Sequence, residues 1–244
     1  MAFISGKSAK VLSDVTDLSA YLNAADTSQD AQLLETTAFG ATGRTYLLGF
    51  KNGTASLKGF WDGATAAVDA VLSAALGSAG GEIVTIAPDG LTVGKRLHLL
   101  LSRLTKYSVS TPVDGVVAVT ADMQADGGID YGISLHDLAE ETVSGSGSAV
   151  NHGAATANGA VAHLHCTATI ATSSETLDVI IEQSATGAWA GEETTLLSFT
   201  QLALVTAKER VAVAGTVQQY LRATWTEGGT GTPGWTFTVG VARR

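Results

Sequence analysis

The stretch from residue 35 to residue 62 constrains the fold most, because it carries a run of alternating side chains. Asn52-Gly53 is a dipeptide typical of tight hairpin turns. After it, Ala55, Leu57 and Gly59 alternate with polar or bulky neighbours, a period of two that indicates a β-strand. We predict a hairpin over residues 46–62, a strand over residues 26–37 and an extended glycine-rich loop between them. Such a long arm cannot bury both faces within one small domain, so we expect it to pair with another copy of the chain.

The rest of the N-terminal half predicts an antiparallel sheet with one helix. Val68, Val71, Leu72 and Ala75 share one helical face, and Gly77 suits the helix end. Strands are expected at residues 81–87, 95–110, 113–124 and 129–134. Residues 13–22 are predicted to form a short helix, and residues 1–12 an arm that only a partner orders. The predicted fold class is therefore mainly β, with an N-terminal antiparallel β-sandwich or barrel, one flanking α-helix and a long hairpin arm.

Residues 143–159 mark the predicted domain boundary, because they are small, polar and rich in glycine. We divide the chain into a first domain (residues 1–144), a linker (145–159) and a second domain (160–244). Short alternating strands in the second domain, with Phe199, Trp225, Trp235 and Phe237 as core aromatics, predict a jelly-roll or immunoglobulin-like β-sandwich.

Charge and composition exclude several classes of protein. The 244 residues carry a formal net charge of −9, and residues 1–144 hold 16 acidic against 9 basic side chains. A protein that grips nucleic acid by its phosphates shows the opposite balance. Membrane insertion is not expected, because no apolar run approaches the length of a spanning helix. A single cysteine, Cys166, excludes an internal disulfide.

No catalytic, metal or cofactor site is predicted, and the chain is not expected to be an enzyme. His163 and His165 lie on one strand face, but a third ligand is missing because Cys166 points to the other face. Asp122, Asp126 and Asp130 surround a turn, where such acids are more often a solvated face than a cation site. Arg222 beside Tyr220 and Trp225 fits either a binding hot spot or a structural salt bridge.

Two ordered sets of motifs carry a family resemblance. The first set is Glu35-Thr36-Thr37-Ala38-Phe39-Gly40, Tyr46, Gly49, Lys51-Asn52-Gly53-Thr54, Leu57-x-Gly59-x-Trp61-Asp62, Ala87-Pro88-Asp89-Gly90, Val93-Gly94, Tyr107, Pro112-Val113-Asp114-Gly115-Val116, Gln124-x-Asp126-Gly127 and Gly132-x-x-Leu135. It resembles the major tail (tail tube) proteins of long-tailed, siphovirus-like bacteriophages and covers roughly residues 12–140. The second, weaker set lies at residues 178–184 and 219–225 and resembles jelly-roll-like appended domains of phage tail and head surface proteins.

The first resemblance implies a structural virion protein that polymerises into stacked, hexameric rings forming the tail tube, the conduit for DNA. It implies assembly in the host cytoplasm. It also implies four partners beyond copies of the chain: a tape measure protein and double-stranded DNA in the channel, and tail terminator and distal tail proteins at the ends. We expect the second domain on the tube exterior. Asp122 is the candidate channel-lining acid, and the expected subunit interface of the hairpin arm comprises Phe39, Tyr46, Leu48, Phe50, Leu57, Phe60 and Trp61.

A second interpretation stays open, in which the chain is a binding module. It would then decorate a capsid or act like an adhesin, with the C-terminal sandwich as the recognition surface. Filaments or rings formed by the purified protein would favour the tube, and monodisperse monomers or trimers would favour the module.

Overall fold

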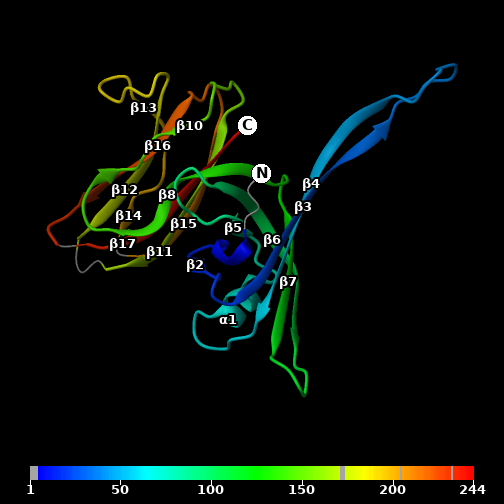
Figure 1. Ribbon diagram of the computed structural model, residues 1–244, viewed down its shortest axis with the longest axis horizontal. Coiled ribbons are helices and arrows are strands. Elements are labelled where there is room, and N and C mark those ends of the chain that lie inside the picture. The colour runs from blue at the N-terminus through cyan, green and yellow to red at the C-terminus, as the bar shows by residue number, and fades with distance from the viewer. Residues whose placement is uncertain (1–4, 171–173, 204, 232) are drawn as a thin grey trace. The chain divides into compact units, whose positions relative to one another are not determined.

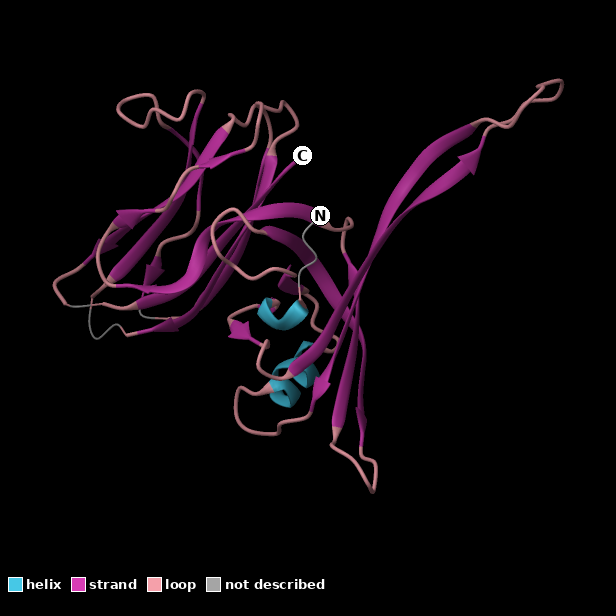
Figure 2. Ribbon diagram, viewed as in Figure 1, coloured by secondary structure: helices cyan, strands magenta, loops and turns pink. Residues whose placement is uncertain are grey.

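Almost every segment with alternating apolar residues is a β-strand in the computed structural model of the chain, which describes residues 5–170, 174–203, 205–231 and 233–244. The predicted mainly β fold class is confirmed, since strands dominate and the described residues contain one α-helix. The chain divides into two compact units (Figures 1 and 2). Unit 1 comprises residues 1–20, 83–99 and 130–244, and unit 2 comprises residues 21–82 and 100–129. No helix among the described residues is long and apolar enough to cross a membrane.

Unit 1 contains a β-sandwich made of two antiparallel sheets. One sheet has the order β15 (Ala207–Val213), β11 (Ala160–Thr169), β17 (Trp235–Arg243) and β8 (Asp130–Glu141), and residues 96–99 of β6 (Arg96–Ser110) pair with β8. The other has the order β10 (Val150–Asn151), β16 (Tyr220–Gly228), β12 (Thr176–Ser184) and β13 (Thr194–Ser198), with β14 (Leu202–Ala203) on β12 and β9 (Gly145–Ser146) on β16. Near the N-terminus, η1 (Gly6–Ser8) precedes β1 (Lys10–Ser13), which pairs with β2 (Thr16–Asp17) and β5 (Glu82–Ala87).

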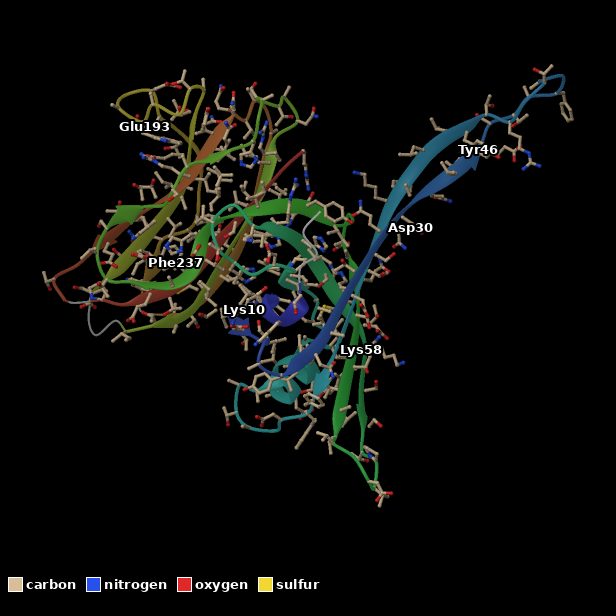
Figure 3. All side chains as sticks on the ribbon, viewed as in Figure 1. Lys10, Asp30, Tyr46, Lys58, Glu193 and Phe237 are labelled. Atoms are coloured by element: carbon tan, nitrogen blue, oxygen red, sulfur yellow. The ribbon has the colours of Figure 1, made fainter. Side chains whose placement is uncertain are left out.

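The sandwich core is formed by side chains that alternate inward from both sheets. The predicted aromatics all belong to it, with Trp235 and Phe237 fully buried and Phe199 and Trp225 nearly so. Phe237, labelled in Figure 3, lies on β17 among the strands of this unit. Because each large apolar side chain contributes about 1.5–3 kcal/mol when buried, this cluster supplies much of the stability of unit 1.

The two compact units do not follow the predicted boundary at residues 144–160. Leu135, before the predicted linker, packs in the sandwich core, and Leu12 and Leu97 pack with Ala242. The predicted linker itself contains β9 and β10, which pair with β16. Two of its glycines serve close packing, since a Cβ on Gly145 would lie 2.8 Å from the Trp225 ring and a Cβ on Gly147 would lie 2.9 Å from Leu135 O.

Unit 2 is an antiparallel sheet in the order β3 (Leu22–Glu35), β4 (Tyr46–Phe60), β7 (Ala118–Ala125) and the part of β6 from residue 100 onward. The predicted helix is present as α1 (Val68–Ala75), with Val68, Leu72 and Ala75 buried. It ends just before Gly77, whose φ of +82° favours glycine. The hydroxyl of Tyr107 on β6 donates to the Asp69 carboxylate of α1 at 2.6 Å, which fixes the helix against the sheet.

Three local predictions are wrong. Asn52-Gly53 lies in the middle of the continuous strand β4, and the hairpin turn is the loop at residues 36–45. Gly53 is needed there for packing, because a Cβ would lie 2.9 Å from Ile129. No helix forms at residues 13–22: Asp14, at a φ of 53°, turns the chain from β1 into β2, and a second turn leads into β3. Residues 1–4 of the predicted N-terminal arm lie outside the described residues, and within residues 5–12 Val11 and Leu12 are buried in the chain itself.

Candidate functional site: an apolar arm

The far end of the β3–β4 ribbon, residues 31–52, extends beyond the neighbouring strand β7 of unit 2; we call it the arm (Figure 1). The pairing with β7 stops at Gly53, so only two strands support the arm. Figure 3 labels Lys58, Asp30 and Tyr46 in order from the base of the ribbon towards its tip. The large apolar side chains of the arm are all exposed: Leu33, Leu34, Phe39, Tyr46, Leu47, Leu48 and Phe50.

Leucines project from both faces of the arm. Leu33 lies opposite Leu48, and Leu34 lies opposite Leu47 in the next register position. Successive residues of a strand point to opposite faces, so the two pairs occupy opposite faces. Leu33, Leu48 and Phe50 are 61%, 65% and 87% exposed. Within the described residues, neither face of this ribbon is covered by another element.

The tip of the arm is a defined loop. Thr36 N donates to Thr45 O at 2.9 Å, and Thr45 N donates to the Thr37 hydroxyl at 3.1 Å. At the turn, Ala41 N donates to Ala38 O, and Gly40 adopts a φ of +89° that favours glycine. These contacts hold the strands together at the tip, so the leucine pairs are presented on an ordered scaffold.

The predicted interface residues fall into three groups. The first comprises Phe39, Tyr46, Leu48 and Phe50, which are all exposed on the arm. Leu57 is fully buried in unit 2, so it packs within its own chain and is not available to a partner. Replacing Leu57 by Asp would therefore damage the fold rather than test assembly, because it buries an unpaired charge.

Phe60 and Trp61 form the third group, at the opposite end of β4 from the arm. Ten residues separate Phe50 from Phe60, or roughly 33 Å of strand. Both aromatics are about half exposed. Trp61 N donates to Val117 O at 3.0 Å, which ties this end of β4 to the segment that precedes β7. They are therefore a separate surface from the arm.

Sequence reasoning missed Leu33, Leu34 and Leu47, which complete both faces of the arm. The available signal was an apolar pair, Leu33-Leu34, inside the otherwise polar run of residues 26–37. Such a pair in a strand places one side chain on each face, and this is the pattern of a ribbon that is buried on both sides.

The open face of the unit 2 sheet is polar, and Asp122 lies on it. The face is formed by Asp26, Ser28, Thr54, Ser56, Lys58, Thr120, Asp122 and Gln124. Ser56 donates to the Asp122 carboxylate at 2.7 Å, and Lys106 occupies the position opposite Asp122 on β6. Asp26 pairs with Lys58 at 3.3 Å. Acidic side chains on this face therefore have basic neighbours, and the face carries little net charge.

The predicted histidine pair is buried in unit 1. Thr85 Oγ1 lies 3.2 Å from His163 Nδ1 and 2.8 Å from His165 Nε2, and His165 Nδ1 lies 2.6 Å from Asp14 O. Burial lowers the pKa of His165 to about 4, and it lowers that of His163 well below its ordinary value. Both rings are therefore neutral at pH 7. Across the described ranges, no group of three His, Cys, Asp or Glu side chains is placed to hold a metal ion.

Two further candidates have partners within the chain. Cys166 is buried on the face opposite the histidines, and its thiol donates to Ala168 O at 3.5 Å. Burial raises the pKa of this thiol to about 11, so it stays protonated at neutral pH. Arg222 pairs with Glu182 at 2.7 Å and stacks over the Trp189 ring at 4.1 Å. These contacts satisfy the charge of Arg222 and match the predicted structural salt bridge.

The chain has distant structural neighbours. No protein-family model and no curated protein sequence matches it. A chain from the virion of a native gene transfer agent is 16% identical, with a TM-score of 0.44, and the match covers 53% of this chain and 98% of that one. A chain from the tail of an empty gene transfer agent particle, with C6 symmetry, is 15% identical over 53% of this chain and 98% of that one, with a TM-score of 0.41.

A third neighbour matches along almost the whole chain. The Dit (gp 19.1) protein of phage SPP1, described as a paradigm of the hub adsorption apparatus in phages that infect Gram-positive bacteria, is 12% identical with a TM-score of 0.39. The match covers 97% of this chain and 99% of that one. These neighbours are phage tail and virion structural proteins, but all three have low sequence identity to this chain and a TM-score below 0.5. The function proposed below therefore rests on the sequence motifs and on the geometry of the arm.

Proposed function

We propose that this chain is a non-enzymatic structural subunit of a bacteriophage virion, a major tail protein whose copies form stacked rings that build the tail tube. The observation that carries the proposal is the arm, which exposes leucines on both faces of an ordered ribbon. The tube motifs of the sequence coincide with it, since Phe39, Tyr46 and Gly49 all lie in the arm. Hexameric rings follow from the same resemblance.

The arm is suited to a contact between copies because an uncovered apolar ribbon is costly in water. Burying a leucine or phenylalanine side chain contributes about 1.5–3 kcal/mol. A single two-stranded ribbon is also marginal in water unless another element packs on it. A neighbouring copy that covers both faces of the arm removes both costs. Because the arm is inserted into a different surface of that neighbour, the contact is heterologous, and such contacts close into rings or extend into filaments.

The polar face of unit 2 is our candidate for the channel surface. It has few apolar side chains, and Asp122 and Asp26 on it are balanced by Lys106 and Lys58. DNA slides past a surface of this kind without the many phosphate contacts that basic proteins make. In this arrangement the partners are the tape measure protein and double-stranded DNA inside the tube, and tail terminator and distal tail proteins at its ends. The strands after residue 160 then face the tube exterior.

Imaging the purified protein by negative-stain electron microscopy tests the proposal. We expect closed rings or hollow tubes, in numbers that increase as the protein concentration is raised. Monodisperse monomers or trimers at all concentrations would contradict it and would favour the alternative, a capsid-decorating or adhesin-like module. In that alternative, the C-terminal sandwich would be the recognition surface.

A further inference from the structure

A hollow of about 360 Å³ in unit 1 is lined by basic and neutral side chains only. Arg96 at the start of β6 and Arg243 near the end of β17 lie on its wall, together with His152 and Tyr131. The remaining lining residues are Gly132, Ile133, Ala154, Ala155 and Val241. The whole chain has 23 acidic and 14 basic residues. A hollow lined by two arginines and no carboxylate is therefore more basic than the chain as a whole.

Arg96 and Arg243 also differ from every other arginine of the chain. Of the seven arginines, the other five pair with carboxylates: Arg44 with Glu35, Arg103 with Asp126, Arg222 with Glu182, and Arg210 and Arg244 with Asp130. Among the described residues, no carboxylate lies within ion-pair distance of Arg96 or Arg243. Uncompensated arginine charges at the wall of one hollow favour the binding of an anion.

Two buried polar atoms at this hollow lack hydrogen-bond partners. They are His152 Nε2 and Arg243 Nε, which belong to two residues of the hollow's wall and accept or donate no hydrogen bond within the described part of the chain. Arg243 donates through its terminal nitrogen to Ala154 O, which anchors the side chain beside the hollow. Burial, with Arg243 and Arg96 nearby, lowers the pKa of His152 to about 4, so the ring is neutral and its orphan nitrogen can donate in the Nε2–H tautomer. Buried polar groups in folded proteins are usually satisfied by protein groups, ordered water or a bound ion, and these two lie on the wall of one hollow beside uncompensated arginine charge.

We infer that this hollow is a binding site for a phosphate-class oxyanion, held by Arg96, Arg243 and His152. Three donors come from three separate segments of the chain, and a tetrahedral oxyanion offers enough acceptor oxygens for all of them. Arginine forks match phosphate oxygens in charge and geometry. The hollow is larger than a single phosphate group, so the source is either inorganic phosphate or a phosphate monoester whose remainder contacts Tyr131.

Isothermal titration calorimetry on the full chain tests this site, with inorganic phosphate and adenosine monophosphate as probes and sodium chloride holding the ionic strength constant. We expect saturable binding with one site per chain. Arg96→Gln should weaken it by roughly ten- to a hundredfold, the loss of one charge-assisted hydrogen bond. Adenosine monophosphate binding at least tenfold tighter than phosphate would assign the site to a monoester, and equal affinity would assign it to free phosphate.

One matched control variant, Arg244→Gln, makes the result decisive. Arg244→Gln removes the same charge from an arginine that pairs with Asp130 and does not line the hollow, so it should leave phosphate affinity within about twofold. Arg96 is exposed and unpaired, so Arg96→Gln should fold normally even if Arg243→Gln does not. The inference is overturned if the wild-type chain shows no saturable binding, or if Arg96→Gln and Arg244→Gln bind phosphate equally.

Discussion

The pair Leu33 and Leu48 gives the sharpest prediction about assembly, because the two side chains lie opposite each other on one face of the arm. Full burial of a leucine contributes about 1.5–3 kcal/mol, and these two are 61% and 65% exposed in the single chain. Covering the remainder in a contact between copies should contribute roughly 2–4 kcal/mol for the pair. Replacing both by Ser should therefore lower the association constant roughly 30- to 700-fold.

Sedimentation velocity across a concentration series measures this loss. The double variant Leu33→Ser/Leu48→Ser should remain monomeric at concentrations where the wild-type chain assembles. Its fold should survive, because exposed cross-strand pairs are worth less than about 1 kcal/mol each, which chemical denaturation can check. Val113→Ser is the matched control, since Val113 is fully exposed but lies outside the arm. If the double variant assembles at the same concentration as this control, the arm is not the contact.

Two further predictions concern unit 1. A chain that ends after residue 142 should be insoluble or largely unfolded rather than form thinner tubes. The reason is that β8 loses its partner β17, and Leu135 loses nearly all of the core residues that it packs against. Expression followed by circular dichroism checks this. The free energy of unfolding should fall as pH drops from about 6.5 towards 4, because the folded state holds His163 and His165 neutral while the unfolded chain takes up their protons. For His165 alone, the loss of unfolding free energy by pH 4 is roughly 3 kcal/mol. The variant His165→Gln should therefore show a smaller difference in unfolding free energy between pH 8 and pH 5, measured by urea unfolding.

Local patterns predicted the elements better than their arrangement. The helix at Val68–Ala75 was readable because its apolar spacing and the following Gly77 act within one segment. The turn was misplaced because Asn52-Gly53 is a hairpin signal in isolation, whereas here Gly53 makes room for Ile129. A glycine that permits a turn and one that permits close packing look the same in a sequence.

The division into units could not be predicted because it depends on pairings between distant residues. β8 joins β17 across about a hundred residues, and Thr85 contacts His163 and His165 across 78 and 80 residues. No local pattern specifies such contacts. The exposure of apolar side chains on the arm was predictable from the sequence, since Tyr46, Leu48 and Phe50 were expected to be available to a partner. The buried position of Leu57 follows from alternation along β4, which placed it on the covered face with Ala55.

An environment-sensitive fluorophore on the arm tests the central claim most directly. Leu48→Cys provides the attachment site, and the native Cys166 should not react because it is buried with a raised thiol pKa. A small fraction of labelled chains is mixed with wild-type chains, and Val113→Cys carries the same label as a control. On assembly, the label at position 48 should shift to shorter wavelength and become shielded from iodide, while the control label stays quenchable. Rings or tubes in which the label at position 48 remains as quenchable as in the monomer would contradict burial of the arm between copies.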